Sequence, residues 1–154
     1  MGDPYQLERF VEAQNRGGTY KLAADELRAG RKRSHWMWFV FPQIAGLGHS
    51  PMSLRYAIGS LDEARAYLEH PVLGPRLTES ARIVAESDAG AAEEIFGGID
   101  AIKLRSSMTL FARANPDEAL FPAVLSRYFG GEVDPVTDRL LSSATGSARR
   151  PSGS

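Results

Sequence analysis

The sequence predicts an all-α fold, a compact single domain of about seven to eight helices. Apolar residues recur at helical spacing along most of the chain, beginning with Leu7, Phe10 and Val11. Glycine and proline stand where helices are expected to begin and end. The 154 residues also match the usual size of one domain.

Each expected helix is marked by an apolar stripe and a start or stop signal. Asp3-Pro4 is a cap followed by proline, Thr19 can cap a second helix, and Ser60 with Glu63 forms a capping box. Gly17-Gly18 and Gly30 end the first two helices. The predicted helices cover about residues 4–15, 19–29, 60–69, 75–86, 99–114, 116–129 and 135–141, with a helical turn at 51–56 and a short helical piece at 89–96.

The segment 36–41 consists of six apolar residues without a period. Its aromatic content and the following Pro42 permit a buried strand, whereas Ser34 as a cap permits a short helix. We favour the helix, because no other segment offers a strand with which it could pair. Residues 44–49, which include Gly46 and Gly48, are predicted to form a loop.

The predicted domain covers residues 1–141, and the polar residues 142–154 are expected to be a disordered tail. The chain has no cysteine, which excludes disulfides and thiolate metal sites. It also shows neither a signal peptide nor an apolar stretch long enough for a membrane helix. We therefore expect a soluble cytoplasmic protein that does not associate with a membrane.

Charge is distributed unevenly along the chain. Residues 27–61 contain no acidic residue and five basic ones, although the whole chain carries a net charge of −1. The remaining residues therefore have a net charge of −6. The basic window also holds both tryptophans and two of the three histidines. This asymmetry indicates attraction of an anion to one region of the protein.

The residues of this window are the parts expected of a pocket for an anionic, nucleotide-like small molecule. Cationic side chains bind phosphate or carboxylate, aromatic faces stack on flat rings, and glycines permit close approach of the backbone. Neutral side chains add hydrogen bonds. The candidate ligand-binding residues are Arg31, Lys32, Arg33, Trp36, Trp38, Gln43, Ser50 and Tyr56.

Each of these features also has a purely structural interpretation. A run of cations such as residues 31–33 is often only solvated, and Trp36 and Trp38 are of a residue type that dominates cores. His35 is either an acid–base catalyst or merely a hydrogen-bonded histidine. The pair Gly46 and Gly48 lacks the strand–turn–helix setting of a dinucleotide motif.

A second group of candidates lies on the predicted helix 99–114. Asp100, Lys103 and Ser107 fall on one stripe beside its apolar face. They either complete the floor of the pocket or form a simple ion pair three residues apart. Lys103 and Ser107 are candidate ligand contacts, and Asp100 joins His35 as a candidate catalytic residue.

Several classes of site are not predicted. The three histidines lack metal-binding spacing, and no phosphate-binding loop or nucleophile-elbow motif is present. We therefore predict no metal and no cofactor.

Long segments of the sequence resemble one protein family. They are SHWMWFVFPQ, GLGHS, residues 56–58, EARAYLEHPVLGPRL and IDAIKLRSSMTLF. The family consists of small helical bacterial and fungal domains of unknown function, some of whose members have been mislabelled calpastatin. The resemblance covers about residues 5–141 and implies an all-α fold without supplying an activity. Inhibitory calpastatin segments are disordered, whereas this chain has the periodicity of a folded core.

Two functions follow from these observations. The first is an enzyme or sensor that binds a small phosphate- or carboxylate-bearing ligand between residues 28–56 and helix 99–114. The second is an interaction module whose basic patch docks an acidic protein or nucleic acid. The charge balance does not favour nucleic acid but leaves it open. The sequence does not determine whether the protein is an enzyme, nor its oligomeric state.

Overall fold

The computed structural model describes residues 2–143. Their fold is all-α, as predicted, and the part of the chain so described contains no strand beyond one isolated bridge between Ile44 and Ile58. Residues 135–143 form a further helical stretch near the C-terminus. The named elements are α1 (Glu8–Asn15), η1 (Arg16–Gly18), α2 (Thr19–Arg28), α3 (Met37–Val40), α4 (Pro51–Arg55), α5 (Leu61–Glu69), α6 (Leu73–Glu86), α7 (Ala92–Ala114) and α8 (Leu120–Phe129).

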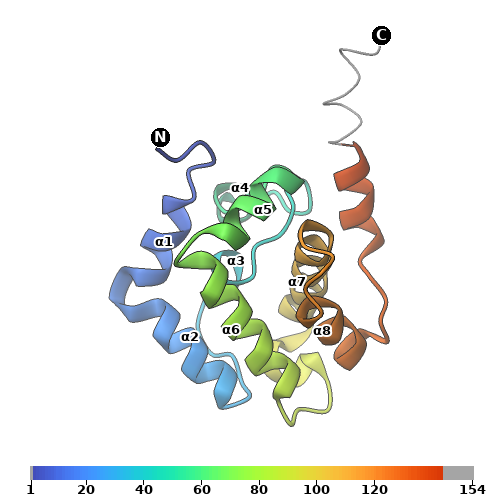
Figure 1. Ribbon diagram of the computed structural model, residues 1–154. Helices are drawn as coiled ribbons and strands as arrows, with labels where there is room; N and C mark the ends of the chain where they lie inside the picture. The colour runs from blue at the N-terminus through green and yellow to red at the C-terminus, as the bar shows by residue number, and fades with distance from the viewer. Residues whose placement is uncertain (1, 144–154) are drawn as a thin grey trace.

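Helix α6 lies between the two sides of the molecule (Figure 1), and the short helix α3 packs against α1 and α6. The N-terminal pair α1 and α2 lies on one side of α6, and α7 and α8 lie on the other. Helix α5 packs on both α6 and α7, so it joins the two sides. All the helices except η1 and α4 contribute buried hydrophobic residues to one shared core, and so does Leu141 in the C-terminal helical stretch.

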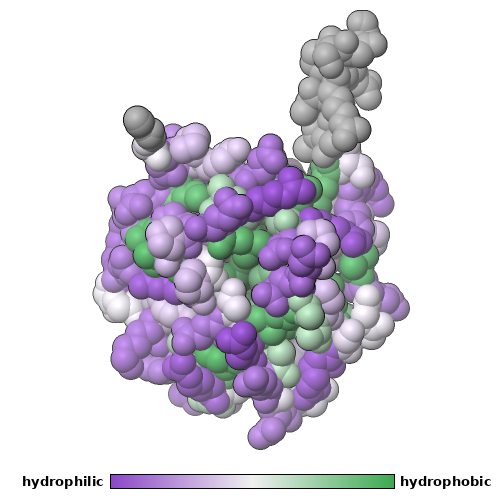
Figure 2. Space-filling model, viewed as in Figure 1, coloured by the Kyte–Doolittle hydropathy of each residue, from purple (hydrophilic) through white to green (hydrophobic). Residues whose placement is uncertain are grey.

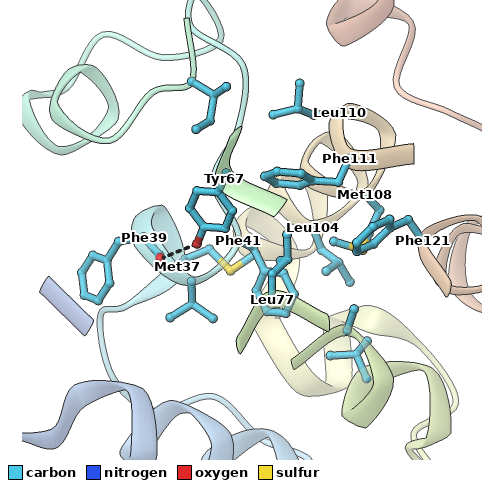
Figure 3. Packing of buried hydrophobic residues seen from close by; sticks show 14 of the residues in the cluster. Met37, Phe39, Phe41, Tyr67, Leu77, Leu104, Met108, Leu110, Phe111 and Phe121 are labelled. Atoms are coloured by element: carbon cyan, nitrogen blue, oxygen red, sulfur yellow. Dashed lines mark hydrogen bonds between the residues drawn. The ribbon is translucent and has the colours of Figure 1, made fainter. Parts of the chain in front are cut away.

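Aromatic and aliphatic side chains from five helices meet in this core (Figure 3). Tyr67 of α5 points towards Phe39 of α3, and its hydroxyl lies 3.5 Å from the Phe39 carbonyl oxygen. Gln14 of α1 donates to the same carbonyl at 2.7 Å, so two buried polar side chains converge on it. Phe111 of α7 lies between Tyr67 and Phe121, with ring centroids 5.4 and 6.0 Å away.

Several predicted boundaries need correction. Helix α1 does not begin directly after Asp3, because residues 4 and 5 form a turn. The carboxylate of Asp3 instead accepts from the backbone N–H groups of Leu7 and Glu8, so α1 begins later than predicted. Thr19 does not cap α2, because its hydroxyl donates back to the Arg16 carbonyl. The capping box of α5 is half formed: Ser60 accepts from the Glu63 backbone, but the Glu63 carboxylate accepts from Gly59.

The two helices expected at 89–96 and 99–114 are one element with a kink. Gly97 has a φ of 79° and a ψ of 171°, which interrupts the helical backbone inside α7. This positive φ explains the glycine, since a side chain would be strained there. The kink turns the second part of α7, residues 98–114, away from the first. Most of the tail predicted to be disordered lies outside the described residues.

The segment 36–41 forms the short helix α3, which confirms the favoured interpretation. Trp36, Met37, Val40 and Phe41 are fully buried, so most of the aromatic block is core. Ser34 does not cap this helix. Its hydroxyl donates instead to the carboxylate of Glu26 at 2.6 Å.

The carboxylate of Glu26 fixes the chain that leads into α3. Besides the Ser34 hydroxyl it accepts the backbone N–H groups of Arg33 and Ser34, at 2.8 and 3.0 Å, and the indole N–H of Trp36 at 2.9 Å. Burial raises the pKa of this carboxyl, but these hydrogen bonds outweigh burial and hold the pKa below its ordinary value. Glu26 therefore stays charged inside the fold and organises residues 33–36.

Arg9 supplies a second, partly buried anchor. Its guanidinium bonds the carboxylate of Glu63 at 3.0 Å and donates to the carbonyl oxygens of Arg55 and Ala57. The segment between α4 and α5 is thereby tied to α1.

Hydrophilic side chains cover most of the face shown in Figure 2 and separate smaller apolar areas. Within residues 2–143, no helix is both long enough and apolar enough to cross a membrane.

We expect Glu26→Gln to lower the free energy of unfolding by about 2 kcal/mol at neutral pH, since it removes a charged acceptor from four donors. Because the folded pKa is depressed, the stabilisation is present above the unfolded pKa and is lost as pH falls through the folded pKa. When urea unfolding is measured from neutral to acidic pH, the free energy of unfolding should therefore fall less in the variant than in the unmodified protein. The exposed Glu12 on α1 provides the control, Glu12→Gln. Equal effects of the two substitutions would contradict the role of Glu26.

Candidate functional site

The candidate site forms where the loop after α2 meets the kink of α7. The backbone N–H of Lys32 donates to the carbonyl oxygen of Ile95, at 2.7 Å, in the first part of α7. The ammonium group of Lys32 reaches Asp100, in the second part of α7, at 2.9 Å. Lys32 thus contacts both sides of the Gly97 kink and joins the loop to α7.

Two lysines share the carboxylate of Asp100. Lys32 pairs with one carboxylate oxygen at 2.9 Å and Lys103 with the other at 3.2 Å. The three side chains are 9, 21 and 18% exposed for Lys32, Lys103 and Asp100. Burial raises the pKa of Asp100, but the hydrogen bonds and charges of the two lysines outweigh it and lower the pKa. These three side chains therefore carry two positive charges and one negative charge at neutral pH, and the charged carboxylate of Glu26 binds the same Ser34 and Trp36 that Lys32 contacts.

Each lysine lies over a tryptophan ring. The ammonium nitrogen of Lys32 is 5.1 Å from the ring centroid of Trp36, and that of Lys103 is 4.4 Å from the centroid of Trp38. Cations at these distances are attracted to the electron-rich face of the ring. The tryptophans therefore hold two positive charges close together in partly dry surroundings.

The cluster has more hydrogen-bond donors than acceptors. The ammonium of Lys32 uses a second donor on the Ser34 carbonyl at 2.5 Å, whereas the ammonium of Lys103 has Asp100 as its one hydrogen-bond partner among the described residues. An ammonium has three donors, so Lys103 has two to spare. Within residues 2–143, two buried side-chain polar atoms lack a hydrogen-bond partner, the indole nitrogen of Trp38 and the hydroxyl of Ser107. Buried donors in this state are uncommon.

Trp38 also lines a cavity of about 90 Å³. The loop of residues 43–48 forms one wall, and residues 53–57, in and after α4, form the other. The bridge between Ile44 and Ile58 holds the two walls together, with hydrogen bonds of 2.8 and 2.9 Å. Gln43, Ser53 and Tyr56 are the polar side chains of the lining.

The structure brings some of the predicted residues together. Lys32, Asp100 and Lys103 form the ion-pair cluster, and Trp36 and Trp38 lie beside it. Ser107 is fully buried on the same helix. Gln43 and Tyr56 line the neighbouring cavity with Trp38.

Other predicted residues lie elsewhere or serve the fold. Arg31, Arg33 and His35 are exposed, and neither arginine has an ion-pair partner within residues 2–143. Trp36 is fully buried, with its N–H on Glu26, so it offers no open stacking face. Ser50 is exposed and caps α4, accepting from the backbone N–H of Ser53.

The two candidate catalytic residues, Asp100 and His35, lie in different surroundings. Both oxygens of Asp100 are in ion pairs and its pKa is lowered, so it is a counter-ion rather than a proton acceptor at neutral pH. His35 stands on the surface next to the buried Trp36. Their catalytic roles remain predictions.

Glu26 is not among the residues predicted from the sequence, although it binds Arg33 and Trp36 on the segment that follows Lys32. A signal was present, because Glu26 lies three residues after Ala23 and directly before Leu27, inside the apolar stripe of α2. An acid on a buried helical face needs donors. The cationic and polar segment that follows α2 supplies them.

The sequence belongs to the family described as "Protein of unknown function (DUF1810)", whose model matches residues 4–141. The chain is similar to a solved structure, the conserved hypothetical protein Rv1873 from Mycobacterium tuberculosis. The two are 54% identical, with a TM-score of 0.88 over 91% of this chain and 99% of that one. No curated protein matches the sequence.

We expect Ser107→Ala to raise the free energy of unfolding by about 1 kcal/mol, because it removes a hydroxyl that is buried without a partner. The neighbouring Ser106 is the matched control. Its hydroxyl donates to Asp134 at 2.8 Å, so Ser106→Ala should destabilise the protein by about 1 kcal/mol. Chemical denaturation of both variants measures the difference. Destabilisation of similar size in both would show that the Ser107 hydroxyl has a partner.

Proposed function

We propose that this protein binds a small phosphate- or carboxylate-bearing molecule at the cluster formed by Lys32, Lys103, Asp100 and Trp38. The observation that carries the proposal is the shared carboxylate, since two largely buried ammonium groups have a single negative partner. Burying a charge without a partner is costly. An anion that supplies the missing charge therefore gains binding energy from a structure that is already assembled.

Lys103 is the residue best placed to contact the ligand. It is more exposed than Lys32, and it has free donors, whereas Lys32 is committed to Asp100 and to the Ser34 carbonyl. Lys32 is therefore a positioning residue. Its replacement would disturb the junction between the loop and α7 as well as the charge.

We expect Lys103→Met to weaken binding of an anionic ligand about tenfold or more, the loss typical of one charge-assisted hydrogen bond. A thermal-shift screen against nucleotides, nucleotide sugars, sugar phosphates and dicarboxylates at low salt identifies the ligand. Titration calorimetry then measures its affinity for each variant. Lys21, on α2, is 82% exposed and provides the control, Lys21→Met. Equal losses of affinity in both variants would indicate a general charge effect and would overturn the assignment of the site to Lys103.

The second candidate function is docking of an acidic macromolecule on the exposed arginines. Arg31 and Arg33 are free of ion pairs within the described residues and point away from the core, as their exposure indicates. Such cations contribute to binding a phosphate backbone through counter-ion release.

If this second function holds, an oligonucleotide should bind at low salt and be released at physiological salt, and Arg31→Ala with Arg33→Ala should abolish the binding. Fluorescence anisotropy with a labelled single strand measures it. The small-molecule proposal instead predicts that the double variant keeps its affinity for the small anion. Loss of both activities in this variant would contradict the assignment of the small anion to Lys103.

A further inference from the structure

A groove lies where the turn before α1 meets α4 and the start of α5. Its volume is about 650 Å³, within the range of about 300 to 1,000 Å³ that is usual for ligand pockets. Residues 4–6 line it from the N-terminal turn, and residues 54 and 55 line it from α4. None of its lining residues belongs to the proposed anion site, so the two sites are distinct.

Arg9 holds the parts of the groove together. An arginine has five N–H donors, and all five of Arg9 are used. They bond the carbonyl oxygens of residues 5, 6, 55 and 57 and the carboxylate of Glu63, at 2.6 to 3.0 Å. The other carboxylate oxygen of Glu63 accepts from the backbone N–H of Gly59. Arg9 and Glu63 therefore build the groove, and neither has a charge or a donor left for an occupant.

The backbone of Gln6 shows that the N-terminal turn is fixed in an unusual conformation. Its φ of 55° lies in the left-handed region, and no other non-glycine residue of the described chain has a positive φ. Such backbone is uncommon outside glycine, and it persists where the surrounding structure enforces it, often at binding sites. Here the carbonyl oxygens of Tyr5 and Gln6 both accept from Arg9, which holds the turn in place.

The lining offers an occupant one positive charge next to apolar surface. Arg55 is exposed and has no ion-pair partner within residues 2–143, and its guanidinium lies 5.6 Å from the ring centroid of Tyr56. Leu54 is a large apolar side chain that is 64% exposed. Pro4 and the partly buried Tyr5 add apolar surface from the N-terminal turn.

The spacing of Leu54 and Arg55 limits the chemistry of the occupant. The two residues are consecutive, so their Cα atoms are about 3.8 Å apart. An occupant that contacts both must carry a negative group and an apolar group close together. The last residue of a peptide does so, because its carboxylate and its side chain are attached to one Cα atom. At about 30 Å³ for each water-sized group, the groove holds about 20 heavy atoms, or about three residues.

We propose that this groove binds the C-terminus of a peptide or protein whose last residue is apolar. The terminal carboxylate accepts from the guanidinium of Arg55, and the last side chain packs on Leu54 and Tyr5. Charge complementarity supports this occupant, since a guanidinium binds a carboxylate through two parallel hydrogen bonds. Capture of a terminal carboxylate is also a recurring mode of peptide recognition. The inference is independent of the proposed anion site.

The test is a titration of the full chain, labelled with ¹⁵N, followed at the backbone amide signals of Gln6, Leu54 and Arg55. The probe is acetyl-alanyl-alanyl-leucine with a free carboxylate. Its C-terminal amide lacks the charge, and acetyl-alanyl-alanyl-alanine lacks the large side chain. A fourth peptide, acetyl-leucyl-aspartyl-alanine amide, carries its carboxylate on an internal residue.

The leucine peptide should give saturable shifts at millimolar concentration. Its amide should bind about tenfold more weakly, because the charge-assisted hydrogen bonds are lost. The alanine-ended peptide should bind about fivefold more weakly, because less apolar surface is buried.

Variants of the protein assign the two contacts. Arg55→Met should weaken the leucine peptide about tenfold, and Leu54→Ala about fivefold. Arg55→Met keeps the backbone carbonyl that Arg9 binds, so the variant should unfold at the same temperature as the unmodified protein. The controls lie on α2: Lys21→Met replaces an exposed cation and Leu22→Ala an exposed leucine, and neither should change the affinity.

Equal affinity for the leucine peptide and its amide, or tighter binding of the peptide with the internal acid, would overturn the assignment to a C-terminus. Absence of any shift at the three amides at millimolar concentration would overturn the groove as a binding site. Lys103→Met should leave the affinity unchanged. Binding that is lost in Lys103→Met and kept in Arg55→Met would place the peptide at the anion site, which would contradict this inference and support the other proposal.

Discussion

The position of the candidate site depends on one buried carboxylate. Glu26 accepts four hydrogen bonds from the segment that follows α2, and all four come from residues 33–36. A charged acceptor with this many donors favours one arrangement of a loop that has no secondary structure of its own. Trp36 is thereby placed in the core and Lys32 beneath the kink of α7. The charge cluster is assembled on this framework.

The kink at Gly97 is the second requirement. It redirects α7 so that Asp100 faces the loop while Ile95 accepts from the Lys32 backbone. Lys103, one helical turn after Asp100, then lies over Trp38. Lys32, Lys103 and Asp100 together carry a net positive charge in partly buried surroundings, and the proposed anion site rests on this charge.

The sequence was sufficient for the all-α class, for most helices and for the stripe on α7, because these follow from helical periodicity. Two side chains that it assigned to one candidate site, Lys32 and Asp100, form an ion pair. It did not reveal that Arg31 and Arg33 are exposed while Lys32 is largely buried. The direction of side chains in a loop follows from tertiary contacts, here the hydrogen bonds to the buried Glu26, and not from a periodic pattern. The bridge between Ile44 and Ile58 joins the two walls of the cavity. It is a contact between two separate segments, which helical periodicity cannot predict.

The most direct test of the anion site is the location of an anion by diffraction. Crystals grown with selenate, a phosphate-like anion with an anomalous signal, would show where it binds. The account predicts the strongest anomalous peak within hydrogen-bond distance of the Lys103 ammonium, beside Trp38, and its absence in Lys103→Met. Peaks confined to Arg31 and Arg33, or a peak at the cluster that persists in Lys103→Met, would contradict it.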